Sequence, residues 1–203
     1  MKLVCVGRNY AAHIEELHNK RPESPVLFIK PDSAILPREQ DFFIPEFSQC
    51  IHYEIELLVK IKKVGKHISQ AFAHKYYDQV TVGIDFTARD LQEQLKSRGL
   101  PWEKAKGFDG AAVIGRWIPK EGLPEMDDLR FALEKNGQMV QDGHTGNMLW
   151  KVDELIAYIS TYFTLKKGDV IFTGTPSGVG QVFPNDYLSG SLEGKELLAL
   201  KVR

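Results

Sequence analysis

The sequence predicts an α+β fold in which a mixed, strongly curved β-sheet carries a few short peripheral helices. Segments with the pattern of strands outnumber those with the pattern of helices. Glycine and proline are scattered as turn markers, and no repeat or low-complexity tract divides the chain. A chain of 203 residues can bury about 70% of the surface of its unfolded form. We therefore expect a single domain over residues 1–203.

The first half of the chain alternates short apolar segments with turn formers. The expected elements are a strand over 1–7 that ends at Gly7, a helix over 10–17 capped by Asn9, a strand over 25–30 stopped by Pro31, and a long alternating strand over 51–63.

A further strand over 80–85 leads directly into a helix, which places Asp85 at a strand end. Thr87 followed by Asp90 resembles a capping box, and Gly99 with Pro101 supplies the stop.

The last third of the chain contains a clear hairpin signal. Asn136 and Gly137 stand between apolar segments at 129–135 and 138–140. Apolar spacing predicts a helix over 152–163, and the chain then returns to strands over 170–173 and 197–202.

Charge and composition exclude some functions. With 26 Lys and Arg against 27 Asp and Glu, the net charge of −1 offers no basic field, so we expect neither nucleic acid nor a membrane as partner. Cys5 and Cys50 lie beside apolar residues without metal-ligand spacing, which predicts buried reduced thiols in a cytoplasmic protein.

Three acids are candidates for a metal site. Strand alternation places His52, Glu54 and Glu56 on one face, with the two carboxylates about 7 Å apart along the strand. A half-exposed polar strand face is the commoner explanation of an isolated pattern of this kind, and the macrodipole of the next helix explains Asp85 equally well. If the three carboxylates converge, they favour Mg²⁺ or Mn²⁺ over zinc or copper.

Other side chains could carry acid–base chemistry or bind a substrate. His13 and Glu16 are neighbours on one helix face, so they form either a general base or an exposed charge pair. Lys30 at a strand end and Lys106 in a polar loop could each neutralise a substrate carboxylate.

The Gly-rich segment 172–180 offers backbone N–H groups for an oxyanion, but it lacks the Lys of a P-loop and the order of a Rossmann turn. No GxSxG elbow occurs, which argues against acyl-enzyme chemistry.

Five motifs in order resemble the fumarylacetoacetate hydrolase family. They are Gly7-Arg-Asn-Tyr10 with His13 and Glu16, Phe28-Ile-Lys-Pro31, His52-Tyr-Glu-Ile-Glu56, Asp85-Phe-Thr-Ala-Arg-Asp90, and Thr173-Gly-Thr-Pro-Ser-Gly-Val-Gly180. The chain looks most similar to short members of the acylpyruvate hydrolase and oxaloacetate decarboxylase type.

The resemblance implies a β-rich fold, a homodimer, and one Mg²⁺ or Mn²⁺ per subunit on Glu54, Glu56 and Asp85. It also implies a water-activating dyad on a lid helix, an active-site lysine, and further substrate contacts. The matching residues are His13 and Glu16 for the dyad, Lys106 for the lysine, and Lys30, Gln92 and Thr175 for the contacts. The role of Arg8 is left open. The segment 143–147 is less rich in Ser and Thr than in many relatives, so contacts there can differ.

The implied reaction is hydrolysis of a carbon–carbon bond in an acylpyruvate, such as a fumarylpyruvate or acetylpyruvate, to pyruvate and a carboxylic acid. The same parts could decarboxylate oxaloacetate or catalyse keto–enol tautomerisation. From other classes, a phosphoryl-transfer enzyme and a non-catalytic metal-stabilised dimer remain open.

Overall fold

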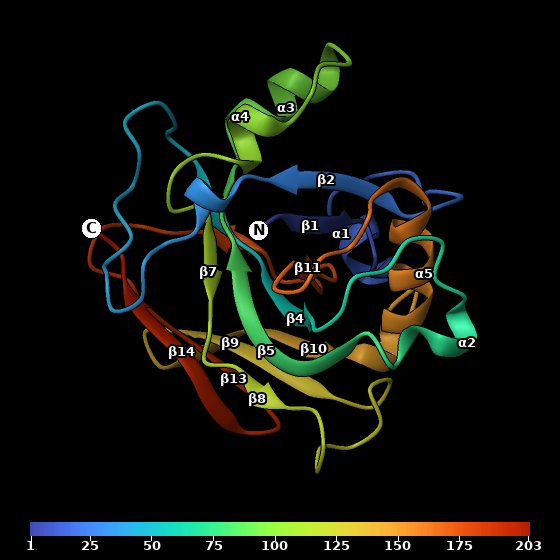
Figure 1. Ribbon diagram of the computed structural model, residues 1–203. Coiled ribbons are helices and arrows are strands. Elements are labelled where there is room, and N and C mark those ends of the chain that lie inside the picture. Colours follow the sequence, from blue (N-terminus) through green and yellow to red (C-terminus); the bar gives the residue numbers. More distant parts are fainter.

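The computed structural model describes residues 1–203 as a curled half-barrel of strands with short helices around it (Figure 1). The main sheet has seven strands, with the order β2-β1-β11-β4-β5-β7 and with β8 paired to β5. Only β1 and β11 pair in parallel, so the sheet is mixed, as predicted. Its strands are β1 (Leu3–Gly7), β2 (Val26–Lys30), β4 (Ile55–Ile61), β5 (Tyr77–Asp85), β7 (Ala112–Ile114), β8 (Ile118–Pro119) and β11 (Val170–Phe172).

Two smaller sheets complete the β structure. A four-stranded sheet has the order β10-β9-β13-β14 and a three-stranded sheet has the order β12-β3-β6. Their strands are β3 (Ile51–Tyr53), β6 (Thr87–Ala88), β9 (Arg130–Lys135), β10 (Gln138–His144), β12 (Gly180–Gln181), β13 (Tyr187–Leu192) and β14 (Lys195–Lys201). The hairpin predicted at Asn136-Gly137 is confirmed between β9 and β10.

The helices are short and lie around the sheets. They are α1 (Ala11–Glu16), α2 (Gln70–Ala73), α3 (Arg89–Ser97), α4 (Glu103–Lys106) and α5 (Val152–Tyr162), with 3-10 turns at Asp32–Ala34 and Thr145–Asn147. In Figure 1, α3 and α4 stand out above β2, while α5 packs with α2 at the right of the view. No helix has the length and apolar character needed to cross a membrane.

Strand alternation divides β4 between two environments. Ile55, Leu57 and Val59 belong to the main core of 37 buried residues, which also includes side chains of the four-stranded sheet. Leu58 packs on the other face, in a smaller cluster with residues such as Cys5 and Phe172. The strand is therefore covered on both faces, which is why it does not resemble an ordinary surface strand.

Three local predictions differ from the structure. The strand expected over 51–63 is interrupted at Glu54 and ends at Ile61. Asn9 does not cap α1, because its side chain instead bonds Trp150 and the Thr173 carbonyl. Thr87 does not cap α3, because it lies in β6 and Ala88 is the cap residue. In each case a tertiary contact outweighs a local preference.

Both cysteines are free, but only Cys5 is fully buried. Cys50 is half-buried, and its Sγ lies 3.2 Å from Nε2 of His52. The expectation that both thiols are buried is thus wrong for Cys50. Position 50 immediately precedes β3, the central strand of the small three-stranded sheet, at the end of the strand, where neighbouring segments cover it only in part.

Candidate metal centre

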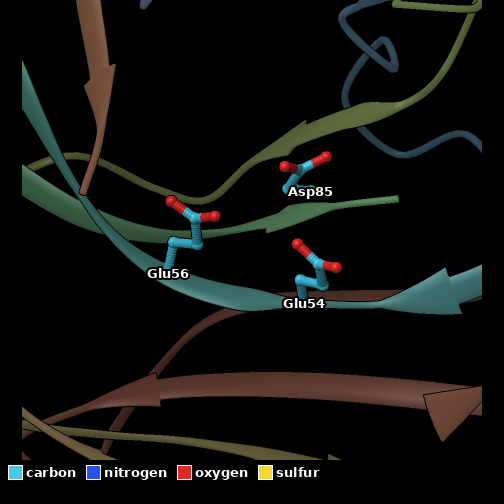
Figure 2. Close-up of side chains that lie close together, drawn as sticks. All are labelled: Glu54, Glu56 and Asp85. Carbon is cyan, nitrogen blue, oxygen red and sulfur yellow. The ribbon is translucent and has the colours of Figure 1, made fainter. Parts of the chain in front are cut away.

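Glu54, Glu56 and Asp85 converge, as the sequence predicted. One ligand oxygen from each carboxylate lies within 4.8 Å of the others. Figure 2 shows the two glutamates rising from the β4 segment and Asp85 meeting them from the end of β5. The three side chains are only 1–4% exposed. The alternative of a half-exposed polar strand face is therefore wrong.

The register of β4 and β5 explains this convergence. Ile55 pairs with Ile84 and Glu56 with Gly83 in the antiparallel ladder. Extending that register by one residue sets Asp85 opposite Glu54, and the Asp85 N–H donates to the Glu54 carbonyl at 2.9 Å. Residues opposite one another in a ladder share a face. Glu56 on β4, Glu54 immediately before β4 and Asp85 at the end of β5 thus meet through the register of these two segments.

Buried cations surround two of the three acids. Lys106 Nζ donates to Glu54 Oε2 and Asp85 Oδ2, both at 2.8 Å, and to Thr87 Oγ1 at 2.6 Å. Arg89 also contacts Glu54. Burial alone would raise the pKa of Glu54, but the charges of Lys106 and Arg89 outweigh it and hold this pKa below its ordinary range.

Glu56 has no cation partner in the structure. Its Oε2 accepts a hydrogen bond from the Gly174 N–H at 2.6 Å. Burial, and then the charge of Asp85, raise the pKa of Glu56 well above its ordinary value. A carboxylate in this position is therefore costly to ionise unless a cation approaches it.

The donor set fits a hard divalent cation. All three side chains offer carboxylate oxygens, which suit Mg²⁺ or Mn²⁺, and no sulfur or imidazole belongs to the cluster. Asp85 Oδ1 lies 2.7 Å from Lys30 Nζ but is not aligned for a hydrogen bond, so this buried atom keeps acceptor capacity. Together with the unpaired Glu56, it makes the acidic triad a metal site.

A cavity of about 70 Å³ opens beside the triad. Its wall contains the three acids, His13, Gln92, Lys106 and Thr175, all of which the sequence singled out. Lys30 is not in the wall. Its ammonium is fully buried behind the site, where it contacts Asp85 and the carbonyls of Phe86, Lys106 and Ala111.

His13 and Glu16 lie together on α1. His13 Nδ1 is 3.3 Å from Glu16 Oε2, and Glu16 Oε1 accepts a hydrogen bond from the Gly178 N–H at 2.9 Å. Because a carboxylate can only accept, this contact places the imidazole hydrogen on Nδ1 and leaves Nε2 as an acceptor. Burial lowers the pKa of His13, and the charges of Glu54 and Glu16 offset this only in part. His13 is therefore neutral near pH 7 and able to take a proton.

Lys106 is buried on α4 and does not lie in a polar loop, which corrects the prediction for its position. Burial opposes its charge, but Asp85 and Glu54 outweigh burial and raise the pKa of Lys106. The short helix forms because the segment after Trp102 packs against β2 and β6.

The helix α3 presents one face to the cavity. Arg89, Gln92, Glu93 and Lys96 follow helical spacing and all line the wall. Arg89 Nη1 donates to Gln92 Oε1 at 2.6 Å, so Gln92 holds the guanidinium that meets Glu54. Sequence reasoning gave Arg89 no role, although it stands inside the quoted motif at 85–90.

Gln141 on β10 is a second residue that sequence reasoning missed. Its Oε1 accepts from the Ile55 N–H at 2.9 Å, directly after the break at Glu54. Its Nε2 donates to Thr175 Oγ1 at 2.9 Å and to the Pro176 carbonyl at 3.0 Å. Gln141 is 1% exposed, so it locks the acid-bearing strand to the Gly-rich segment. No local pattern marks such a residue.

Comparison with known proteins shows the family to which the chain belongs. The model of the fumarylacetoacetate (FAA) hydrolase C-terminal family matches residues 2–201. The chain is 38% identical over 200 residues to the mitochondrial oxaloacetate tautomerase FAHD1 of Bos taurus, covering 98% of this chain and 90% of that protein. It is 41% identical over 197 residues to the oxaloacetate tautomerase YcgM of Escherichia coli, covering 97% of this chain and 90% of that protein.

A mitochondrial oxaloacetate decarboxylase of Dictyostelium discoideum is 40% identical over 194 residues, covering 95% of this chain and 89% of that protein. Solved structures also match. A putative fumarylacetoacetate hydrolase family protein from Yersinia pestis has a TM-score of 0.95 at 39% identity, covering 100% of this chain and 93% of that one.

The structure of fumarylpyruvate hydrolase from Pseudomonas aeruginosa, in complex with Mn²⁺ and pyruvate, matches with a TM-score of 0.93 at 36% identity. The match covers 100% of this chain and 89% of that one. The family expected from the sequence motifs and the β-rich fold are thus confirmed. The chain belongs to the fumarylacetoacetate hydrolase family, and within it to the short type that is similar to oxaloacetate tautomerases and decarboxylases.

Proposed function

We propose that this protein is a Mg²⁺- or Mn²⁺-dependent oxaloacetate tautomerase that interconverts the keto and enol forms of its substrate. The observation that carries the proposal is the placement of His13. A neutral imidazole, oriented by Glu16, lines the same cavity as the acidic triad. Tautomerisation needs one proton acceptor beside an activated 2-oxo acid, and it needs no attacking water. The names of the relatives from Bos taurus and Escherichia coli agree with this reaction.

The triad is where the cation would bind, one per subunit. Glu54, Glu56 and Asp85 would hold it with carboxylate oxygens. When bound, the ion would supply Lewis acidity toward the oxygens of a 2-oxo acid and would neutralise the excess charge of the acids.

The residues of the chain divide the proton transfer between them. His13 Nε2 removes a proton from C3 of oxaloacetate, and the imidazolium so formed gives that proton to the 2-oxo oxygen, which yields the enol and restores the neutral base. Glu16 stabilises the imidazolium while it exists, because its carboxylate contacts Nδ1. Lys106 and Thr175 in the cavity wall face the charge that develops on the oxygen. We propose that Gln92 positions the substrate through the face of α3, and that Lys30 acts through Asp85.

Two further reactions could use the same site. In decarboxylation, the C3–C4 bond of oxaloacetate breaks to release CO₂, its electron pair passes into the pyruvate enolate, and a proton from the solvent, relayed through His13 Nε2, is added to C3. The name of the Dictyostelium discoideum relative favours this outcome. In hydrolysis of an acylpyruvate, His13 would activate water. The Pseudomonas aeruginosa structure, named as a fumarylpyruvate hydrolase with pyruvate, favours that outcome. We rank hydrolysis below tautomerisation because the three curated relatives all act on oxaloacetate by name.

Parallel assays distinguish the three reactions. The ultraviolet decay of enol-oxaloacetate reports tautomerisation, and pyruvate release from oxaloacetate and from acetylpyruvate reports decarboxylation and hydrolysis. Each is measured with Mg²⁺, with Mn²⁺ and with EDTA. We expect the largest metal-dependent acceleration in the enol decay. Pyruvate release from acetylpyruvate that exceeds it would overturn the assignment in favour of hydrolysis.

Matched variants test the roles within α1. His13→Asn and Glu16→Gln should lower kcat by about 10²- to 10⁴-fold, since general acid–base groups contribute that much. The controls His18→Asn and Glu15→Gln make the same changes at exposed neighbours and should retain activity. Calorimetric titration of Mg²⁺ should give nearly the same affinity for His13→Asn as for wild type. A comparable loss of metal from that variant would contradict the role of His13.

A further inference from the structure

Arg8 is a half-buried residue that lines the cavity and has no assigned task. Unlike Arg89, which pairs with Glu54 and Gln92, its guanidinium makes no hydrogen bond or ion pair within the chain. Its backbone has a φ of 60°, a left-handed conformation that costs a residue other than glycine on the order of 1 kcal/mol. Such strain is commonly retained where a side chain must be held at a functional site.

Lys96 lines the same cavity as Arg8, and its exposure places it at the cavity mouth. It lies in the last turn of α3, and its Nζ donates to Asn19 Oδ1 at 2.9 Å. Arg8 and Lys96 both belong to the wall of this one cavity of about 70 Å³. Burial, and then the positive charge of Arg8, lower the pKa of Lys96. Two like charges at one rim repel each other unless an anion binds between them. Glu93 is the one acid of the cavity wall outside the triad.

The summed charge of the cavity wall also favours an anionic ligand. Its wall carries four cationic side chains and four acidic ones, with Arg8, Arg89, Lys96 and Lys106 set against Glu54, Glu56, Asp85 and Glu93. A divalent cation at the triad leaves two formal positive charges. That balance matches a substrate with two negative charges, and a monoanion would leave one charge uncompensated.

We propose that Arg8 and Lys96 bind the second carboxylate of a 2-oxo dicarboxylate, the one remote from the 2-oxo acid group. This assignment rests on the proposed function and names the residues that select its substrate class. The triad and Lys106 receive the 2-oxo acid end, while the pair at the rim distinguishes a dicarboxylate from a monocarboxylate. Because Lys96 also holds Asn19, just beyond α1, the pair stands next to the helix that carries His13 and Glu16.

A binding experiment tests the pair without turnover. Pyruvate and 3-sulfopyruvate share the 2-oxo acid end, but only 3-sulfopyruvate carries a second anionic group. Each is titrated calorimetrically into Mg²⁺-loaded protein, for wild type, Arg8→Gln and Lys96→Gln. Wild type should prefer 3-sulfopyruvate, and each variant should reduce that preference by about 10- to 100-fold, the usual effect of losing a hydrogen bond to a charged group. Arg98→Gln, which removes an exposed guanidinium just after α3, should keep the wild-type preference.

The outcomes separate this inference from the proposed reaction. An unchanged preference in both variants, or equal loss of both ligands, would overturn the role of the pair even if enol-oxaloacetate decay is fast. A preference that falls as expected supports the pair even if wild type does not accelerate that decay, in which case only the proposed reaction fails. If Arg8→Gln does not fold, Lys96→Gln at the exposed rim decides the matter alone.

Discussion

At the scale of single residues, the metal site depends on an imbalance among three buried acids. Glu54 is held by two cations, whereas Glu56 meets only a backbone N–H. Glu56 is therefore the residue whose ionisation costs most in the metal-free protein, and the one that gains most when a cation binds.

This imbalance predicts a pH dependence of stability. The pKa of Glu56 is raised above its ordinary value of 4.5. The contribution of this side chain to the stability of the folded protein is therefore fully present below pH 4.5 and is lost as the pH rises toward the raised pKa. In EDTA, this contribution to the free energy of unfolding should fall by up to about 1.4 kcal/mol per pH unit. Urea denaturation from about pH 5 to about pH 8 measures it.

The Glu56→Gln variant isolates the effect. The lowered pKa values of His13 and His52 give the opposite slope below 6.5, but wild type and variant share that slope. The difference between their stabilities should therefore report Glu56 alone. Saturating Mg²⁺ should remove the dependence in wild type and should not stabilise the variant. Identical pH profiles for the two proteins in EDTA would show that Glu56 is not the costly acid.

At the scale of elements, the β4–β5 ladder places the acids, and the segment after β11 holds them. The Gly174 N–H reaches Glu56 from a backbone with a φ of 103°. A Cβ at this position would lie 2.7 Å from the Asn9 Cβ. The segment can thus approach both the acid and the residue before α1 only because it carries no side chain there.

Gly174→Ala should therefore damage stability and metal binding together. Gly168→Ala is the matched control, because Gly168 has a φ of 90° with nothing within 4 Å of an added Cβ. Both variants incur backbone strain at a positive φ, but only Gly174→Ala adds a collision with Asn9. We expect Gly174→Ala to lose about 1–3 kcal/mol more of its free energy of unfolding than the control. Thermal denaturation and Mg²⁺ titration measure the two effects. Equal losses in both variants would mean that the contact with Asn9 is unimportant.

At the scale of the whole molecule, the two faces of the main sheet have different tasks. One face packs against the four-stranded sheet in the main core, and the other carries the acids under α3 and α4. The acids thus lie on strands that the core holds, while Arg89, Lys96 and Lys106 of the cavity wall come from the peripheral helices α3 and α4. Side chains held on regular elements in this way keep the geometry that a metal site needs.

The homodimer implied by the family resemblance is a prediction at this scale. Sedimentation equilibrium should give a mass twice the 23.0 kDa of one chain, and the same mass should persist in EDTA if the metal lies within each subunit. A mass of one chain at micromolar concentration would contradict the dimer. The cytoplasmic location expected from the sequence also stays a prediction, and fractionation of cells that produce the protein would test it.

The sequence by itself determined the family, the curved α+β fold, and the residues of the metal site. The order of the motifs carried that information. Taken alone, the alternation at 52–56 favours a surface strand, and the strand end at Asp85 is equally consistent with an acid at a helix start. The hairpin at Asn136-Gly137 and the helix over 152–163 were predictable because their signals are local.

Only the tertiary structure decided how the acids are used. Register set Asp85 opposite Glu54, packing buried Lys30 behind the site, and a distant strand supplied Gln141. Packing also paired Glu54 with Lys106 and Arg89, buried His13 so that it is a neutral base, and brought Arg8 and Lys96 into one cavity wall. These are properties of neighbours far apart in the chain, and charge interactions and desolvation depend on distance in space, which local sequence does not encode.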